Sequence, residues 1–599
     1  MRVISLSFLI LMLFSQSFSQ GEKRIVILHT NDLHSRLTGY APESAYTPMS
    51  VKDDNTVGGF ARIAAIIKNE KANNPGSTLV LDGGDFLMGT LFHALEVNTG
   101  FQLSLMKKMG YDAAGLGNHE FDFGTEKLAA IINSARENGE IPALLLGNAI
   151  FDSNDQKDDA LVSLFSDSIV SKKLVIERGG LKIGLFSILG KVADHDAPYA
   201  SPVKFARQTA AARRLVKELK ADKCDLIICV SHSGIDKNKK GEWDGEDVAL
   251  ARSVPGIDVI ISGHTHTKLE QPLNINGVKI VQVGEHGQFV GRLELVFNDA
   301  TLVSNNYRLI PVDDNIPGIS DIHQSIENHK IKVNDEILAP LGFDFNKPLA
   351  ETDFLLECNE QGDFKSSNLG PMVADAIHSY INRHTSKGTD IAMVAVGVIR
   401  DKIVPGVQTA PDIFRVMSLG SGSDDVPGYA LARLFVTGKE LKSIMEILQV
   451  AYKSTPANYC YYSGCRVLYD PDKGIFNKIR KIEIIRKDEG LVVVDFSKKN
   501  TTLYSITANS YMLEFIGIIK KMSFGIINVV PKDALGNPVK DMQKAVIDLD
   551  ESLPGIQEGK EWLALMELII SMKDMNGNGI PDIDNKYSSA VKTFFSGEN

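Results

Sequence analysis

Short apolar stretches alternate with longer segments of helical periodicity over the first 300 residues. The apolar stretches have the length of strands, whereas GGFARIAAIIKNEK and TAAARRLVKELK repeat their apolar residues every three or four positions. This alternation is typical of an α/β sheet covered by helices. Five of the stretches are expected to be strands of that sheet: 24–34, 77–85, 113–120, 225–232 and 257–266.

Metal-binding residue types gather where these five stretches end. In an open α/β sheet, ligands bind at the carboxyl ends of the strands. A solvated strand end explains one polar residue there, but it explains five such endings poorly, because five of the chain's 13 histidines lie at these ends. The residues concerned are Asp32, His34, Asp85, Asn118, His119, His232, His264 and His266.

The residue types at this edge fit two metal ions. Imidazole together with carboxylate suits zinc, manganese or iron, whereas calcium prefers oxygen ligands alone. In the D-x-H and H-x-H sequences, alternate residues of an extended chain point the same way, so both side chains can face one ion. One carboxylate can bridge two cations about 3.5–4 Å apart. Asp85, which follows two glycines, is the expected bridge.

Six motifs connect the chain to a known family. HTNDLH, GGFARI, LDGGD, GNHEFD, SHSGID and GHTHT, in this order, resemble the calcineurin-like metallophosphoesterases and, more narrowly, the exported 5′-nucleotidase and UDP-sugar hydrolase family. The resemblance covers nearly all of residues 24–300 and implies an α/β fold, an αββα sandwich. By analogy, one metal ion takes Asp32, His34, Asp85 and His266, and the other takes Asp85, Asn118, His232 and His264. The position of His266 varies among relatives.

The motif GNHEFD adds two residues that are not expected to bind metal. Asn118 is a neutral oxygen ligand, and His119 is too close to it to bind the same ion comfortably, so its ring can face the substrate. Asp122 can hydrogen-bond that imidazole and keep it protonated. The resemblance also makes His119 and Asp122 a catalytic dyad. Glu120 is expected to be structural, and a polar turn is the alternative for the whole segment.

A second α/β region follows a charged helical segment. SSNLGPMVADAI, DIAMVAVGVIRDKI and YALARLFVTGKELKSIMEIL resemble the substrate-binding domain of the same family, with weaker motifs, up to about residue 510. The expected organisation is a signal peptide at 1–19, a metallophosphoesterase domain at 20–310, a helical linker at 311–345, a 5′-nucleotidase-type C-terminal α/β substrate domain at 346–555 and a tail at 556–599.

The substrate-binding residues of the family are only partly present. The resemblance carries an arginine over to Arg400 and one aromatic wall of a base-binding clamp to Tyr511. The opposite wall falls on Leu419, and a second arginine of the family falls on Asp363. A lost aromatic partner removes stacking worth ~1–3 kcal/mol per base. We therefore expect altered or relaxed specificity, although Arg400 has a surface salt bridge as its alternative role.

The N-terminus is typical of an exported protein. Arg2 precedes the apolar stretch VISLSFLILMLF and small residues before a cleavage site after Ser19, as in a secretory signal peptide. A transmembrane anchor, the alternative, needs ~20 apolar residues. No other stretch predicts a membrane span, so a periplasmic or extracellular protein is expected. A net charge of −11 argues against binding to nucleic acid polymers.

One loop near the C-terminus has the spacing of a calcium site. DMNGNGIPD places oxygen-bearing side chains as at the start of a calcium loop. Asn585 stands where the twelfth position should be a glutamate, so an ordinary polar turn is the alternative. The candidate calcium ligands are Asp574, Asn576, Asn578 and Asp582.

The cysteines do not have the spacing of a zinc site. Export permits disulfides, and Cys460 and Cys465 are close enough in sequence to bridge across a turn. Cys224 and Cys229 lie in an apolar stretch and are expected to be buried thiols.

Together these features predict a metal-dependent hydrolase of phosphomonoester or pyrophosphate bonds in small phosphate esters, of the 5′-nucleotidase and UDP-sugar hydrolase type. His119 would either stabilise the phosphoryl oxygens or protonate the leaving alcohol. Two alternatives are a phosphatase for a non-nucleoside ester and a non-catalytic surface protein with structural metals. The intact pair of His119 and Asp122 counts against the second alternative, because a structural site has no use for it.

Overall fold

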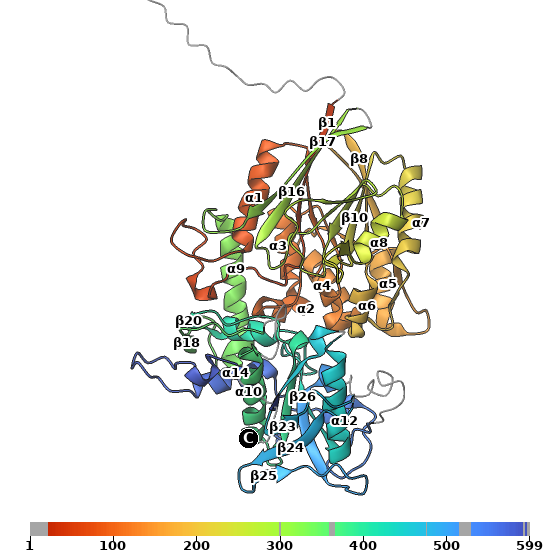
Figure 1. Ribbon diagram of the computed structural model, residues 1–599. Helices are drawn as coiled ribbons and strands as arrows, with labels where there is room; N and C mark the ends of the chain where they lie inside the picture. The colour runs from red at the N-terminus through yellow and green to blue at the C-terminus, as the bar shows by residue number, and fades with distance from the viewer. Residues whose placement is uncertain are drawn as a thin grey trace, which may run out of the picture.

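The computed structural model describes residues 22–298, 301–358, 366–453, 455–474, 476–513, 529–590 and 594–595. The expected signal peptide at 1–19 and Asp363 lie outside these residues. Figure 1 shows two bodies, one built from the N-terminal half of the chain and one from the C-terminal half, with α9 (Ser320–Val333) beside their junction. The domain boundaries given above stay a prediction.

Two mainly parallel sheets lie face to face in the first body, here called the metal domain. The first sheet has the order β17 (Thr301–Pro311), β16 (Phe289–Asn298), β1 (Glu22–Thr30), β2 (Thr78–Asp82), β3 (Ala113–Gly115), β4 (Ala143–Leu145) and β6 (Val170–Ser171). The second has the order β14 (Leu273–Ile275), β15 (Val278–Val281), β13 (Val259–Ser262), β10 (Leu226–His232), β8 (Leu181–Leu189) and β7 (Lys173–Arg178).

Alternate residues along a strand point to opposite faces of the sheet and so pack into different cores. On β1, Ile25 and Ile27 enter the core between the sheets, whereas Val26 and Leu28 face the helices outside. Because both faces are covered, these strands read as continuous apolar runs. The helices that cover the sheets include α1 (Phe60–Asn73), α3 (Phe101–Met109) and α4 (Gly124–Glu137) on one side and α7 (Gln208–Ala221) and α8 (Glu246–Ser253) on the other. The fold is the expected αββα sandwich.

The second body, here called the substrate domain, packs helices against two four-stranded sheets. One sheet has the order β21 (Leu431–Thr437), β26 (Leu503–Asn509), β19 (Ile391–Ala395) and β22 (Cys460–Ser463). The other has the order β25 (Gly490–Val493), β24 (Ile479–Arg486), β23 (Cys465–Tyr469) and β27 (Phe594–Phe595). The main helices are α10 (Leu369–His384), α12 (Gly438–Ala451) and α14 (Glu561–Ile570).

Local sequence explains where these helices begin. Thr437 and Glu440 form a reciprocal capping box at the start of α12, in which the Glu440 carboxylate accepts from the Thr437 backbone N–H at 2.8 Å. Trp562 of α14 is fully buried, and α14 packs along α10. Helix α14, which lies in the predicted tail, therefore contributes to the core of the substrate domain.

Cys224, Cys229, Cys460 and Cys465 do not take part in disulfides. Cys460 and Cys465 lie on β22 and β23, which belong to different sheets, so the turn between them separates their side chains. Cys229 is buried on β10 as expected, while Cys224 precedes that strand and is only half-buried. Within the described residues, no helix has both the length and the apolar composition needed to cross a membrane.

Candidate metal centre and dyad

The candidate ligands of the metal domain lie mostly in turns beyond the strands. β1, β2 and β13 end at Thr30, Asp82 and Ser262, whereas β10 runs up to the ligand His232. Five ligand residues have positive φ: Asp32 (51°), His34 (48°), Asp85 (54°), His264 (75°) and His266 (52°). The prediction of an extended D-x-H and H-x-H chain is therefore wrong. Left-handed turns, which are uncommon for residues with a side chain, aim these groups instead.

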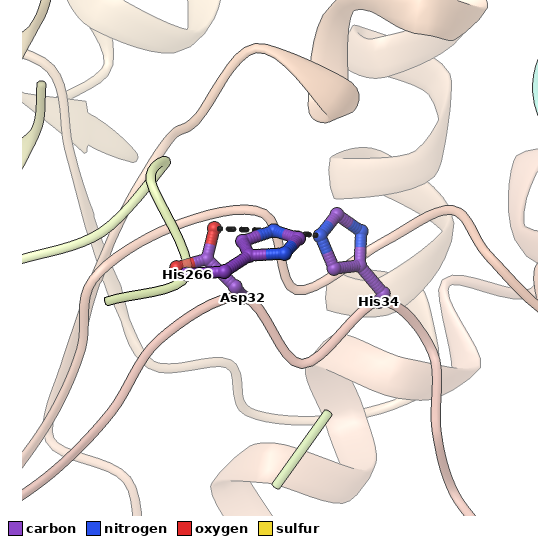
Figure 2. A group of neighbouring side chains, drawn as sticks. All are labelled: Asp32, His34 and His266. Carbon is purple, nitrogen blue, oxygen red and sulfur yellow. Dashed lines mark hydrogen bonds and ion pairs between the residues drawn. The ribbon is translucent and has the colours of Figure 1, made fainter. Parts of the chain in front are cut away.

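Asp32, His34 and His266 form the first group of potential ligands (Figure 2). One ligand atom from each lies within 4.8 Å of the others. Nε2 of His266 lies 3.1 Å from Nε2 of His34 and 3.6 Å from Oδ1 of Asp32. Asp32 and His34 come from one turn, and His266, which is 232 positions from His34 in sequence, comes from another.

Asp85, His232 and His264 form the second group, again with ligand atoms within 4.8 Å of one another. Nε2 of His232 lies 3.0 Å from Oδ2 of Asp85. Oδ1 of Asn118 lies 3.1 Å from Nε2 of His232 and 3.0 Å from Nδ1 of His264, so the amide oxygen faces the same space. Asp85 also groups with His34 of the first set, which is the arrangement expected of a bridging carboxylate.

A glycine makes room for the bridging carboxylate. A Cβ at Gly117 would lie 2.2 Å from Oδ1 of Asp85, so any larger residue there would displace it. The same carboxylate accepts a hydrogen bond from the backbone N–H of His119 at 2.8 Å. Gly117 therefore permits the close approach of two loops.

The donor set of this structure fits two divalent cations. Asp32 and Asp85 are buried carboxylates surrounded by imidazoles, and buried charges are normally paired or bound to metal. Burial opposes the charged form of Asp85, but His232 and His119 outweigh it and hold its pKa well below its usual range. Mixed nitrogen and oxygen donors suit zinc, manganese or iron. The assignment of each ligand to one ion stays a prediction.

Hydrogen bonds and ion pairs from neighbouring groups orient the imidazoles of the candidate ligands. Nδ1 of His232 donates to the carbonyl of Gly83 at 2.9 Å, which leaves Nε2 facing the ligand cluster. Nδ1 of His266 pairs with the carboxylate of Glu285. Burial would lower the pKa of His266, but Glu285 and Asp32 raise it to about 8. Glu285 was missed in the sequence, although it follows the apolar stretch of β15 as the ligands follow theirs.

His119 and Asp122 lie in one 3-10 turn at the edge of this cluster, η3 (His119–Phe123). A hydrogen bond of 2.6 Å joins Nδ1 of His119 to Oδ2 of Asp122. Burial alone would lower the pKa of His119, but Asp122 and Asp85 together raise it. A ring nitrogen of His119 also lies within 4.8 Å of ligand atoms of His34 and Asp85, so the imidazole faces the metal cluster.

Glu120 joins the loops that carry the ligands. Its carboxylate is fully buried and accepts backbone N–H groups of Gly117 (2.6 Å), Asp85 (3.0 Å) and Leu87 (2.9 Å). The structural role expected for Glu120 is confirmed by these contacts, which hold the GNHEFD turn against the turn of Asp85.

The substrate domain brings Arg400 to the same site. The guanidinium charge of Arg400 is among the influences on the pKa of His119, Asp122 and His266, and it lowers each of them. No hydrogen bond or ion pair of the Arg400 side chain occurs within the described part of the chain. A surface salt bridge, the alternative role for Arg400, is thus not seen among the described residues.

An aromatic cluster next to the dyad contains the other predicted substrate residue. Tyr511 stacks on Tyr429, with ring centroids 5.3 Å apart and an interplanar angle of 9°. Leu419 packs in the same cluster, with Met88. Tyr429 was not predicted from the sequence. Residues 420–428 form a loop that brings Tyr429 back beside Leu419, and the Tyr429 backbone N–H donates to the carbonyl of Leu419 at 3.1 Å.

Comparisons with known proteins agree with this architecture. Residues 25–268 match the model of the calcineurin-like phosphoesterase family, and residues 350–517 match that of the 5′-nucleotidase C-terminal domain. The trifunctional nucleotide phosphoesterase protein YfkN of Bacillus subtilis is 27% identical over 450 residues, which are 70% of this chain but 27% of that longer protein. The 5′-nucleotidase of Mus musculus is 26% identical over 489 residues, covering 77% of this chain and 78% of its own.

Among solved structures, a 5′-nucleotidase precursor from Thermus thermophilus has the same fold, with a TM-score of 0.66 and 20% identity over 95% of this chain and 99% of that chain. Fold and site together define a calcineurin-like phosphoesterase, a metal-dependent hydrolase of phosphoesters. The C-terminal domain then specifies the group: the chain belongs to the 5′-nucleotidase family.

Proposed function

We propose that this protein is an exported 5′-nucleotidase or UDP-sugar hydrolase that cleaves phosphomonoester or pyrophosphate bonds of nucleotides. The observation that carries the proposal is the convergence of the ligand groups beside the hydrogen-bonded pair of His119 and Asp122, to which the substrate domain adds the guanidinium of Arg400. A planar fork of N–H donors is suited to a phosphate group. The names of the relatives agree with a nucleotide substrate.

The residues divide the work of hydrolysis between them. Asp32, His34, Asp85, Asn118, His232, His264 and His266 would hold the two ions. When bound, such ions neutralise the phosphate and lower the pKa of a water toward ~7. His119, whose pKa is raised by Asp122 and Asp85 against the effect of burial, would face the phosphoryl group as a donor. Asp122 fixes Nδ1, so that Nε2 is the atom that stabilises an oxygen of the substrate or gives its proton to the leaving group.

A second candidate substrate, a phosphate ester without a nucleobase, is favoured by the stack of Tyr429 on Tyr511. Their centroid distance of 5.3 Å is that of two aromatic rings in contact, so a base cannot lie between them. A base would then gain stacking from one face at most. Such a site should discriminate weakly between a nucleoside monophosphate and a sugar phosphate.

A panel of phosphate esters tests these proposals. The purified protein, loaded with manganese or zinc, is given AMP, UDP-glucose, glucose 1-phosphate and p-nitrophenyl phosphate, and product formation is measured. Preference for AMP or UDP-glucose supports the nucleotide proposal. Equal kcat/KM for all phosphomonoesters supports the second candidate. Absence of hydrolysis in metal-loaded protein would leave only the non-catalytic binding protein.

The location outside the cytoplasm is part of the same proposal and is supported by the sequence of residues 1–19. Fractionation of the native cells, with N-terminal sequencing of the mature protein, tests it. A chain that begins at Met1 in the cytoplasm would contradict it.

We also propose calcium as the ligand of the loop that holds Asp574, Asn576, Asn578 and Asp582. The missing twelfth-position glutamate has a substitute in Glu351 of β18 (Ala350–Thr352), whose Oε1 contacts the side-chain amides of Asn576 (2.5 Å) and Asn578 (2.8 Å). Calorimetric titration of the protein with calcium and the variant Glu351→Gln test this. Heat of binding that is identical in both proteins would contradict the assignment of Glu351.

A further inference from the structure

A buried ionic network crosses the boundary between the two domains. Arg415 of the substrate domain binds Glu43 of the metal domain (3.0 Å) and its own neighbours Asp412 (2.6 Å) and Asp401 (3.1 Å). Arg36 of the metal domain binds the same Oδ2 of Asp401 at 2.7 Å. All five side chains are buried, the most exposed at 7%. Charges at an exposed interface are solvated by water, whereas buried charges such as these need partners of opposite charge.

Tyr40 of the metal domain completes the network. Its ring lies under the guanidinium of Arg415, at 4.3 Å from the centroid, and near that of Arg36, at 5.2 Å. Its hydroxyl donates to the carbonyl of Lys402 at 3.1 Å. Two consecutive residues of the substrate domain, Asp401 and Lys402, are therefore held by side chains of the metal domain.

The residue before them is Arg400. Its backbone N–H donates to the carbonyl of Val416 at 2.9 Å, so its main chain is tied to the turn that carries Arg415. The side chain of Asp401 enters the network, and the guanidinium charge of Arg400 is near enough to act on the pKa of both dyad residues. At the other end, Arg36 lies in the turn that carries the ligand His34.

We infer that Asp401 is a positioning residue. Because its carboxylate is held by both Arg36 and Arg415, Asp401 determines how far Arg400 extends toward the substrate phosphate. It also links Arg400 to the turn that carries the ligand His34. The inference rests on the proposed function, because it takes Arg400 as the phosphate-binding group. Its consequence is that phosphate binding and domain contact are coupled. A substitution at Asp401, whose carboxylate is held by Arg36 and Arg415, should weaken substrate binding.

The test is a double-mutant cycle in the full-length, metal-loaded protein. Asp401→Asn keeps the shape and removes the charge that both guanidiniums share. It should raise KM for the best substrate of the panel by about fivefold to fiftyfold, the range of coupling between residues in contact. In an Arg400→Ala background the same change should have little further effect, because Asp401 acts through Arg400.

A matched control separates this role from general stability. Glu70→Gln breaks a comparably buried pair with Arg292 (2.9 Å) inside the metal domain, remote from Arg400. It should lower Tm but leave KM unchanged. Tyr40→Phe, which removes only the bond to Lys402, should raise KM about twofold with Tm nearly unchanged, and it serves as the second test if Asp401→Asn does not fold.

Two results would overturn the inference. One is a normal KM in Asp401→Asn or, if that variant does not fold, in Tyr40→Phe. The other is an effect of Asp401→Asn that adds in full to that of Arg400→Ala. Failure of the proposed function looks different, because the wild-type protein would then hydrolyse none of the esters while its network stayed intact.

Discussion

The metal domain and the substrate domain build their parts of the site in different ways. In the metal domain, the candidate ligands follow β1, β2 and β3 of one sheet and β10 and β13 of the other. The expectation that the five stretches share one sheet is therefore wrong, and the strand ends of two facing sheets bring the ligands together. In the substrate domain, Arg400 and Tyr511 follow the parallel strands β19 and β26, and Tyr429 precedes the antiparallel β21, so all three lie beyond one edge of a single sheet. The metal ligands thus depend on how two sheets face each other, whereas the candidate substrate residues share one sheet edge and depend on the loops that leave it.

The difference also has an energetic side. Five candidate ligands hold left-handed backbone conformations, which cost on the order of 1–3 kcal/mol each for residues with a side chain. Metal binding can offset that cost. The aromatic pair of the substrate domain sits in ordinary packing, so its residues can change with smaller penalties. We therefore expect the metal domain to be sensitive to single changes and the substrate domain to be tolerant.

The sharpest test of this contrast is Asp85→Asn. Loss of the shared carboxylate charge should remove metal and reduce turnover by about a thousandfold or more, beyond the ~10–100-fold typical of second-sphere residues. Metal analysis and kcat of the purified variant check it. His266→Gln should lose less metal, since an amide can still offer an oxygen. Equal loss in both variants would mean that Asp85 is not the bridge.

His119→Ala should separate catalysis from metal binding. We expect turnover to fall by ~10²–10⁴-fold, the usual contribution of a positioned proton donor, while two metal equivalents remain. Metal content and kcat are measured on the same preparation. Loss of one full equivalent would make His119 a ligand, a role that its distance to His34 and Asp85 also permits.

Chelation should act on the metal domain alone. At a metal concentration ~1,000 times the Kd, binding stabilises the folded state by about 4 kcal/mol, so removal should lower the Tm of that domain by on the order of 10 °C. Calorimetry before and after treatment with a chelator measures the shift, and manganese should restore it. A similar shift in the transition of the substrate domain would erase the proposed contrast.

Arg400→Ala should raise KM rather than lower the metal content. Loss of a charge-assisted bond to phosphate corresponds to ~1.5–3 kcal/mol, or about 10–150-fold in KM. Arg400→Lys should recover part of this, because lysine keeps the charge but not the fork. Steady-state kinetics with AMP decides. An unchanged KM in Arg400→Ala would remove this residue from the substrate site.

The smallest effect is expected at the aromatic pair. Tyr429→Leu frees one face of Tyr511, so KM for AMP should fall by about fivefold, which corresponds to ~1 kcal/mol of stacking. Turnover of p-nitrophenyl phosphate should stay the same. Tyr199→Leu is the matched control, because Tyr199 packs against Tyr429 in the same cluster. A higher KM for AMP in Tyr429→Leu would show that Tyr429 itself contacts the base.

The sequence by itself determined the fold class and the composition of the metal centre. Apolar runs of strand length and helical periods in GGFARI and TAAARRLV are local signals, and the elements they predict formed as β1, α1 and α7. The convergence of His34 with Asp85 followed from one rule, that parallel strands meet at a common carboxyl edge, because β1 and β2 are parallel neighbours. His266 joins them from the second sheet.

Only the tertiary structure decided how these residues are aimed and what surrounds them. The left-handed turns at the ligands are imposed by neighbouring loops, as at Gly117 and Asp85, and a residue pattern carries no record of them. The contacts of Tyr429 with Tyr511 and of Arg36 with Asp401 join segments 82 and 365 positions apart. Such pairs depend on how loops and domains pack, so periodicity, which reports on neighbours along the chain, does not reveal them.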